Sequence, residues 1–182
     1  MYLPSGGDDA ELVRRCLAGD SRAFEDLVER HQRALFNVAF RLLGSYPDAR
    51  DATQNAFVHA YEHLGTFNPA HRFFSWIYRI LKNDCLNVLR ARRPFEPVDP
   101  NLPARDRADE ALDTAERQRV VQAALLKLSK EYREVIVLRH FADLPYEEIA
   151  AILEVPVKTI KSRLYTARQH LGELLADWKP PR

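Results

Sequence analysis

A run of prolines near the middle of the chain excludes any continuous helix there. Four prolines recur at every third position, with acidic residues between them: Pro94, Pro97, Pro100 and Pro103. Proline lacks a backbone N–H and its ring clashes with a helix interior, so this stretch favours extended backbone. The 182 residues are therefore expected to form two small domains, residues 1–93 and 116–182, joined by a flexible acidic linker over residues 94–115.

Apolar residues on both sides of the prolines recur at steps of three and four, which is the period of an α-helix. In the first part, the pattern predicts helices over about residues 21–44, 47–64 and 72–89, with a loop at 65–71. Acidic residues at the helix start, such as Asp8 and Asp9, suit the helix dipole. No stretch alternates with a period of two for long enough to make a sheet, so the expected fold class is all-α.

The second part contains the most specific local pattern. Helices are expected around residues 120–128 and 132–138, followed by a short helix at 146–153, a tight connection, and a longer helix from Lys158 to about Leu174. The inward apolar residues fit a helix-turn-helix, whose second helix enters the major groove of DNA. The alternative is an ordinary helical hairpin with a basic, solvated face.

Charge is balanced overall, with 27 basic and 26 acidic residues, but it is unevenly placed. Residues 70–93 hold six basic side chains and one acid, and residues 155–173 hold four and one. Between them, residues 94–118 hold seven acids and three arginines. Two basic segments separated by an acidic spacer indicate two contacts with one polyanion, and solvated helix faces are the alternative.

Several classes of function lack their motifs. The chain has no glycine-rich phosphate loop, no HExxH and no GxSxG, so an enzyme and a cofactor are not expected. His59 and His63 lie four residues apart without an evident third ligand, so no metal site is expected. Cys16 and Cys85 are interpreted as small buried hydrophobic residues. No apolar stretch is long enough to span a bilayer and no signal peptide is evident, so we expect a cytoplasmic protein without membrane insertion.

Three segments resemble one protein family. They are DARDATQNAF at residues 48–57, FSWIYRI at 74–80 and LPYEEIAAILEVPVKTIKSRLYTAR at 144–168. Together they resemble the bacterial extracytoplasmic-function (ECF, group 4) sigma factors of the sigma-70 family. The resemblance spans nearly the whole chain and implies a subunit that directs core RNA polymerase to promoters and aids promoter opening in transcription initiation. A free-standing helix-turn-helix regulator is the alternative function.

The resemblance also implies three sets of binding residues and three partners. Sigma region 2, in the first domain, would bind the clamp helices of the polymerase beta-prime subunit through Asp51, Gln54, Asn55, Phe57 and Val58. It would bind the minus-10 promoter element through Phe67, Asn68, His71, Arg72, Arg79, Lys82, Asn83, Asn87 and Arg90. Sigma region 4, in the last domain, would bind the minus-35 element through Lys158, Thr159, Lys161, Ser162, Arg163, Tyr165 and Arg168. Core RNA polymerase and promoter DNA are the implied partners, and an anti-sigma factor is left open as a third.

The residue types in these sets suit their implied roles. Asn83 and Asn87 lie four apart on one helix face, and their amides both donate and accept hydrogen bonds, as base edges require. Phe67 would wall a pocket for an unstacked base. For two aromatic residues the interpretation stays open: Trp76 is either a melting wedge or a core residue, and Phe57 is either a contact or purely core.

At four positions the chain departs from the family pattern. Arg50 and Asn55 stand where acids are common, and Thr166 replaces a frequent basic residue. Glu154 stands at the turn of the helix-turn-helix, where a glycine is frequent. A residue with a Cβ there favours a different backbone angle.

Overall fold

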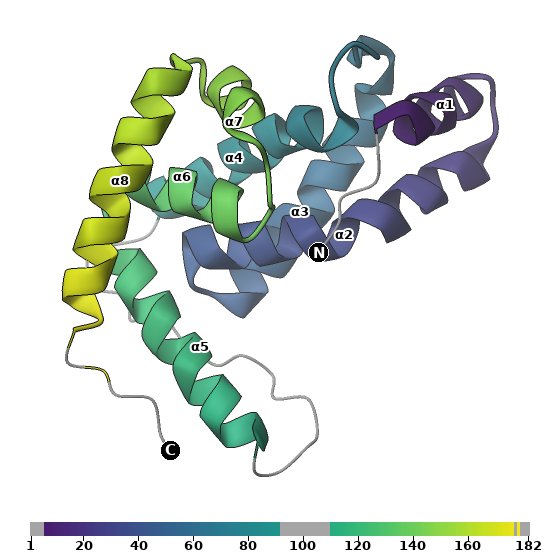
Figure 1. Ribbon diagram of the computed structural model, residues 1–182. Coiled ribbons are helices and arrows are strands. Elements are labelled where there is room, and N and C mark those ends of the chain that lie inside the picture. Colours follow the sequence, from purple (N-terminus) through teal and green to yellow (C-terminus); the bar gives the residue numbers. More distant parts are fainter. Residues whose placement is uncertain (1–5, 92–109, 177, 179–182) are drawn as a thin grey trace.

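A computed structural model describes residues 6–91, 110–176 and 178, and these form α-helices without strands (Figure 1). The first part of the chain contains four α-helices and one 3₁₀ helix: α1 (Gly6–Leu17), α2 (Ser21–Leu43), α3 (Tyr46–Glu62), η1 (Leu64–Thr66) and α4 (Phe73–Ala91). The second part contains four: α5 (Glu110–Lys127), α6 (Lys130–His140), α7 (Tyr146–Leu153) and α8 (Val157–Leu174). The expected all-α fold class is confirmed. No helix in the described ranges is long and apolar enough to cross a membrane.

Local capping sets the bounds of α2. Asp20 is the N-cap, and its side chain accepts a hydrogen bond from the backbone N–H of Arg22 at 3.2 Å. Gly44 is the C-cap and takes a left-handed conformation with φ 72°, which costs glycine little. The sequence expectation for this helix is therefore confirmed.

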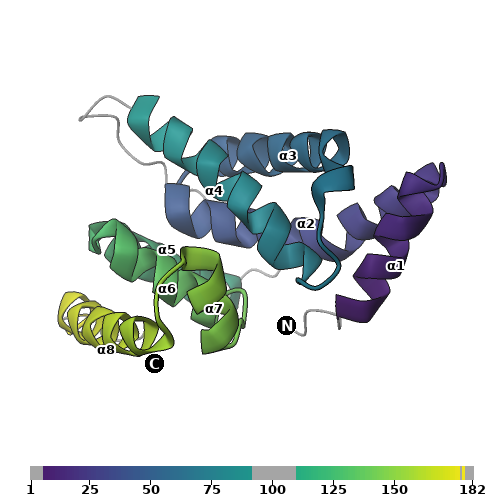
Figure 2. The same cartoon turned by 90° about the horizontal axis from the view of Figure 1, so that it is seen from above.

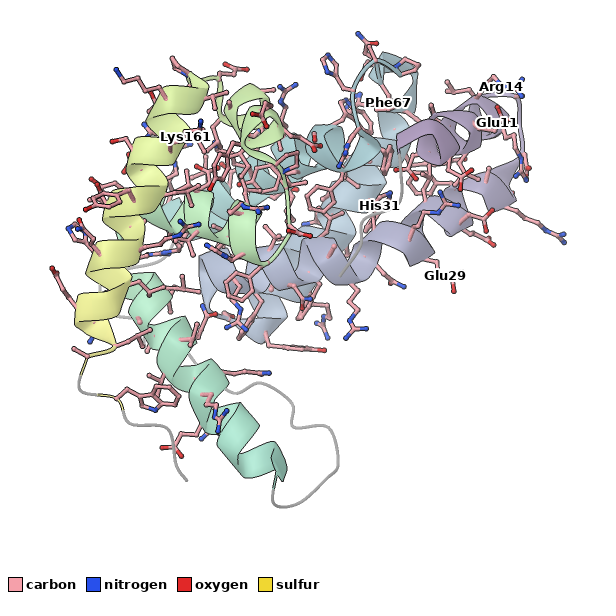
Figure 3. All side chains as sticks on the ribbon, in the orientation of Figure 1. Glu11, Arg14, Glu29, His31, Phe67 and Lys161 are labelled. Atoms are coloured by element: carbon pink, nitrogen blue, oxygen red, sulfur yellow. The ribbon has the colours of Figure 1, made fainter. Side chains whose placement is uncertain are left out.

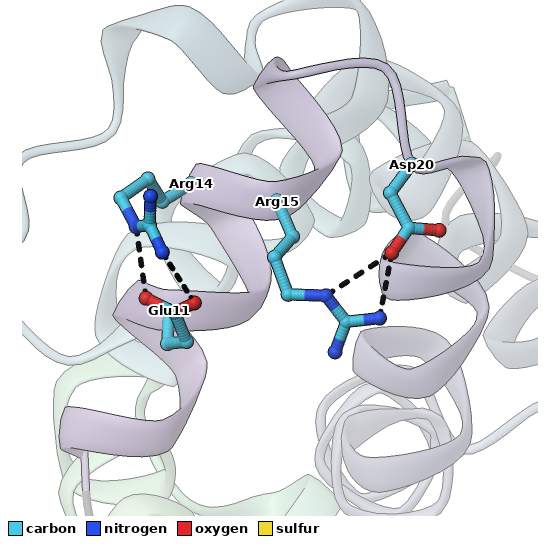
Figure 4. A network of polar contacts seen from close by, with 4 residues as sticks. All are labelled: Glu11, Arg14, Arg15 and Asp20. Carbon is cyan, nitrogen blue, oxygen red and sulfur yellow. Dashed lines mark hydrogen bonds and ion pairs between the residues drawn. The ribbon is translucent and has the colours of Figure 1, made fainter.

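Helix α1 continues into α2 through a short turn that an ion pair closes. Arg15 Nη2 lies 2.6 Å from Asp20 Oδ2, so the residue that caps α2 also binds the last turn of α1 (Figure 4). Hydrogen bonding to Arg15 holds the pKa of Asp20 below its usual value. A second pair, between Glu11 and Arg14, lies along the exposed face of α1. Exposed pairs of this kind contribute little to stability, because water screens them, so burial of Leu12 and Val13 is the main force that docks α1.

Helices α2, α3 and α4 pack around a core rich in aromatic residues. Phe73, Phe74 and Tyr78 on α4 are all buried, which explains why this helix carries so many aromatics. Trp76, on the same helix, is half-buried and packs against that core. Cys85 is also buried, as the sequence interpretation expects, whereas Cys16 is only partly so.

The second part of the chain begins earlier than expected. Helix α5 starts at Glu110, inside the segment interpreted as a linker, so residues 110–115 are helical. That stretch contains no proline and begins with acids that suit a helix start. The proline run of residues 94–103 lies outside the described residues. The expected helix-turn-helix is confirmed, since α7 and α8 follow the expected bounds closely.

The two parts share one continuous hydrophobic cluster. Helix α2 contacts α5 and α6, and α4 contacts α7. Polar bonds cross the same boundary: Arg133 donates to the backbone oxygen of Leu42 at 2.9 Å, and Gln122 donates to that of Phe40 at 3.3 Å. Figure 2 shows α7 beside α4, with α8 at the outer edge, packed on α5, α6 and α7.

Candidate nucleic-acid interface

The loop between η1 and α4 has an aromatic floor. The ring of Phe67 lies 5.7 Å from that of Phe73 and 5.6 Å from that of Trp76, measured between centroids. The Asn68 side chain accepts a hydrogen bond from the N–H of Ala70 at 2.9 Å and so shapes the loop. Phe67 is buried under this loop, whereas Asn68 and His71 are exposed. The sequence predicts that Phe67 walls a pocket for a base, and in the structure Phe67 is among the residues that line a cleft at this loop.

A cleft of about 520 Å³ opens at this loop. Its walls come from the loop, which ends at Arg72, from Arg79 on α4, and from α7 through Glu148 and Ala151. Residues of both parts of the chain therefore line one hollow.

One stripe of α4 carries four exposed polar side chains. Arg79, Asn83, Asn87 and Arg90 are all exposed and follow one another at steps of four, four and three residues, so they share a face. Two amides flanked by two guanidinium groups can bind base edges and phosphates together. Lys82 lies on the adjacent face of α4 and pairs with Glu134 of α6 at 2.8 Å. Arg72, which immediately precedes α4, pairs with Glu148 of α7 at 3.1 Å.

Helix α8 presents a second polar face. Its exposed side chains from the predicted set are Lys158, Lys161, Ser162, Tyr165 and Arg168, while Thr159 and Arg163 are half-buried. Ile160 and Leu164 on the opposite side are buried against α6 and α7. Figure 3 shows Lys161, on α8, well apart from Phe67, in the loop before α4.

The turn before α8 has the backbone angle that glycine favours. Glu154 takes φ 55° and ψ 41°, in the left-handed region, and its N–H bonds back to the oxygen of Ala150. The expectation of a different angle at this position is therefore wrong. The tight connection holds Glu154 in this region despite its Cβ, at a conformational cost.

Between α2 and α3 lies a wide groove of about 1150 Å³. Phe24 and Tyr61 line it with ring centroids 4.9 Å apart, and Val58 is exposed at its rim. Phe57 is buried and forms part of the floor, so it serves the core and lines the groove. Among the other predicted contact residues of α3, Asp51, Gln54 and Asn55 are exposed.

Family models match most of this architecture. The model described as Sigma-70 region 2 matches residues 27–95, and that described as Sigma-70, region 4 matches residues 118–171. The chain belongs to the sigma-70 family. Residues 27–95 are called region 2 below, and residues 118–171 region 4.

Full-length relatives agree with this assignment. The chain is 34% identical to an ECF RNA polymerase sigma-E factor of Escherichia coli, over 88% of this chain and 91% of the relative. It superposes on CnrH, solved in complex with the cytosolic domain of CnrY, with a TM-score of 0.76, 31% identity, and coverage of 94% of this chain and 99% of CnrH. It also superposes on the Bartonella quintana sigma factor RpoE, solved with the anti-sigma factor NepR, with a TM-score of 0.70, 26% identity, and coverage of 86% and 98%. This sigma factor is thus of the ECF type and acts in transcription initiation.

A buried polar cluster beneath region 2 was not found from the sequence. Asp9, which is 2% exposed, lies 3.1 Å from Arg30 Nη1 and 3.0 Å from His31 Nε2. The His31 ring lies 5.4 Å from Phe73, which in turn supports Phe67 (Figure 3). The sequence marks Asp9 as a helix-start acid, and only the packing of α1 on α2 reveals its partners.

Two buried groups of α4 have raised pKa values. Burial and the neighbouring Glu134 carboxylate raise the pKa of Tyr78 well above its usual value, so its hydroxyl stays protonated and donates to Glu134 at 2.8 Å. Burial likewise raises the pKa of Asp84, against the opposing effect of His59, whose Nδ1 lies 3.7 Å away. No cluster of three or more metal-ligating side chains occurs within the part of the chain that the structure describes.

Proposed function

We propose that this sigma factor holds core RNA polymerase with region 2 and reads promoter DNA at two separate faces. The stripe on α4, together with the loop before it, would bind the minus-10 element, and the polar face of α8 the minus-35 element. The observation that carries this assignment is the pair of exposed polar faces, one on α4 and one on α8, in two separate helical units. One DNA duplex that contacts both faces must run from α4 to α8, as a promoter with two separate elements would.

At the minus-10 element, the Asn83 and Asn87 amides would read bases, and Arg79 and Arg90 would hold the neighbouring phosphates. Asparagine suits this role because it offers a donor and an acceptor to one base edge. Phe67 supports the loop at Asn68 and His71 from below, which gives an extruded base a rigid place to bind. The half-buried position of Trp76 against Phe67 favours a supporting role in the same floor.

At the minus-35 element, α8 would enter the major groove. Lys161, Ser162 and Tyr165 lie at the centre of its exposed face, and Lys158 and Arg168 flank them. Lysine and arginine bind phosphates, while the serine and tyrosine hydroxyls reach base edges or sugars.

The groove between α2 and α3 would bind the clamp helices of the beta-prime subunit. Its apolar floor, with Phe24, Phe57 and Tyr61, suits the apolar side of a helix. The polar rim of such an interface would come from α3, whose Asp51, Gln54 and Asn55 are exposed.

The remaining assignments concern organisation and partners. Residues 1–93 would act as the domain that binds core polymerase and the minus-10 element. The segment from residue 94 to the start of α5 at Glu110 would act as the linker, and α5 to α8 as the minus-35 domain. The partners are core polymerase, promoter DNA and an anti-sigma factor, the last supported by the Bartonella relative solved with one. The chain would act in the cytoplasm, without catalytic activity of its own.

Run-off transcription with purified core polymerase tests the two DNA assignments against each other. Templates carry changes in either the minus-10 or the minus-35 element. Asn83→Ala with Asn87→Ala should lose discrimination between minus-10 templates and keep that between minus-35 templates. Lys161→Ala with Tyr165→Ala should do the reverse. A loss of about 1–3 kcal/mol per base contact is large enough to measure in yield. If both variants lower yield equally on every template, neither face reads sequence.

A further inference from the structure

The last residue of α6 contacts one of the arginines that the proposed function gives to the minus-35 element. Helix α6 packs beside α8 (Figure 1), and it ends at His140. Nε2 of His140 lies 3.3 Å from Nη2 of Arg168, on α8. Both side chains are exposed. His140 belongs to none of the residue sets predicted from the sequence, so only the packing of α6 on α8 brings it to this face.

The chemistry of the two groups fixes the direction of their hydrogen bond. A guanidinium carries only N–H donors, so Arg168 donates and Nε2 of His140 accepts through its lone pair. An imidazole with a free lone pair on Nε2 is neutral. Burial and the positive charges of Arg168 and Arg139 lower the pKa of His140, and the opposing effect of Asp143 is smaller. His140 is therefore an uncharged acceptor near neutral pH.

An uncharged acceptor suits an arginine that binds a phosphate. A carboxylate in this place would also orient the guanidinium, but it would neutralise the charge that attracts DNA. Within the described residues, Arg168 has no ion pair, and the hydrogen bond of its guanidinium is the one to His140. The long side chain is thus ordered before DNA arrives, while its full charge remains available.

A second side chain of the same face is held in the same way. Nε2 of Gln169 donates to the hydroxyl oxygen of Tyr165 at 3.0 Å, across one turn of α8. The Tyr165 hydroxyl keeps its own hydrogen for an acceptor on DNA. Gln169, like His140, is not among the predicted contact residues. Two exposed groups of α8 that the proposed function turns toward DNA therefore have neutral partners that orient them.

We propose that His140 is a positioning residue for minus-35 binding: as a neutral acceptor, it holds the Arg168 guanidinium in place for a phosphate without neutralising it. The inference rests on the proposed function of α8, in which Arg168 binds the DNA backbone. The contact supplies affinity and no base discrimination, because phosphates carry no sequence information. Loss of His140 should therefore weaken binding to different duplexes by a similar factor.

Three substitutions at His140 separate the acceptor from the ring. His140→Ala removes the acceptor. His140→Gln restores an uncharged one, because the amide oxygen can accept from Arg168. His140→Glu supplies an acceptor that also neutralises the guanidinium.

The matched control is His170, a second exposed histidine at the contact between α6 and α8. Its ring lies edge-on to that of Tyr132, on α6, with centroids 5.4 Å apart, and it makes no hydrogen bond to Arg168. Substitutions at His170 disturb the same pair of helices and leave the Arg168 contact intact. His170→Ala and His170→Glu are therefore compared with the same changes at His140.

Binding is measured with holoenzyme that is reconstituted from core polymerase and each variant of the full chain. The probe is a fluorescein-labelled duplex from a template that the wild-type holoenzyme transcribes, and anisotropy is recorded at about pH 8, where the imidazole is neutral. His140→Ala should weaken binding about two- to fivefold relative to His170→Ala, and His140→Gln should recover most of the loss. His140→Glu should weaken binding more than His170→Glu. It should also reduce the slope of log affinity against log salt by about 1, the contribution of one phosphate contact.

Thermal denaturation of the free chain separates positioning from a purely structural role. A carboxylate at position 140 would pair with Arg168, so His140→Glu should keep or raise the melting temperature while it weakens DNA binding. Loss of a structural contact would instead lower both. In an Arg168→Ala background, His140→Ala should have no further effect on affinity, because the group that it positions is absent.

The outcomes also separate this inference from the proposed function. Equal affinities of His140→Ala and His170→Ala would overturn it, and so would a His140→Ala effect that persists without Arg168. Lys161→Ala in the same assay tests whether α8 binds DNA at all. If Lys161→Ala weakens binding and His140→Ala does not, α8 binds DNA and the role of His140 alone is refuted. If neither substitution changes affinity, the assignment of α8 to DNA fails together with this inference.

Discussion

Removal of the buried Asp9 carboxylate should destabilise region 2 far more than loss of an ordinary surface acid. Asp9 belongs to α1 and lies between Arg30 and His31 of α2. A carboxylate only accepts hydrogen bonds, so the Nε2–H group of His31 is the donor in its hydrogen bond to Asp9. The imidazole is only 1% exposed, so water cannot replace the hydrogen bond that Nε2 would lose. The other ring nitrogen, Nδ1, has no hydrogen-bond partner among the described residues.

The magnitude follows from the two bonds that Asp9→Ala breaks. A buried group left without its partner costs about 1–3 kcal/mol, which applies to His31. Arg30 is partly exposed and also lies 3.2 Å from Asp8, so loss of its ion pair with Asp9 adds only about 0.5–1 kcal/mol. We expect a loss of about 1.5–4 kcal/mol in the free energy of unfolding. Asp9→Asn keeps an acceptor for His31 and should cost about half as much.

Urea denaturation followed by far-UV circular dichroism measures this difference. Asp8→Ala is the matched control, because Asp8 is the preceding acid on the same helix but its side chain is 75% exposed. That variant should lose no more than about 0.5 kcal/mol. If Asp9→Ala and Asp8→Ala unfold at the same urea concentration, the buried carboxylate does not hold α1 on α2.

Three further outcomes are expected. Glu154→Gly should stabilise region 4 by about 1 kcal/mol in thermal denaturation, because it removes a Cβ from a left-handed position. Burial and the nearby Arg168 lower the pKa of His140, so its imidazole binds a proton more readily in the unfolded chain than in the folded one. The free energy of unfolding should therefore fall as the pH drops below the usual pKa of histidine. His140→Gln should make the melting temperature depend less steeply on pH in this range. Burial raises the pKa of Cys85 to about 12, so alkylation at neutral pH, followed by mass spectrometry, should label Cys16 well before Cys85.

Features set by neighbouring residues could be predicted from the sequence. Asp20 and Gly44 mark the ends of α2 because capping is a matter of one turn of backbone. The two helices around Glu154 were predicted for a similar reason, since their apolar residues recur with the helical period. The polar stripe through Asn83 and Asn87 also follows from spacing alone, and its exposure agrees with that pattern.

Features that depend on packing between distant elements could not be predicted. Nothing in the sequence near Asp9 points to His31, which follows it by 22 residues. The burial of Phe67 depends on Phe73 and Trp76 of the next helix, so a loop aromatic that looks accessible becomes a floor. The start of α5 at Glu110 could not be predicted from composition, because acidic residues continue from the proline run into the first turns of the helix.

The two acids at the start of α7 look equivalent in the sequence but differ in their contacts in the structure. Glu147 and Glu148 both lie in the first turn, where the helix dipole favours either of them by about 0.3–1 kcal/mol. From the sequence, their substitution by glutamine should have equal effects. In the structure Glu148 contacts Ser75 on α4 and Arg72 just before it, whereas Glu147 is exposed. A difference between the two variants therefore measures the contact between region 2 and region 4, because the dipole contribution is common to both.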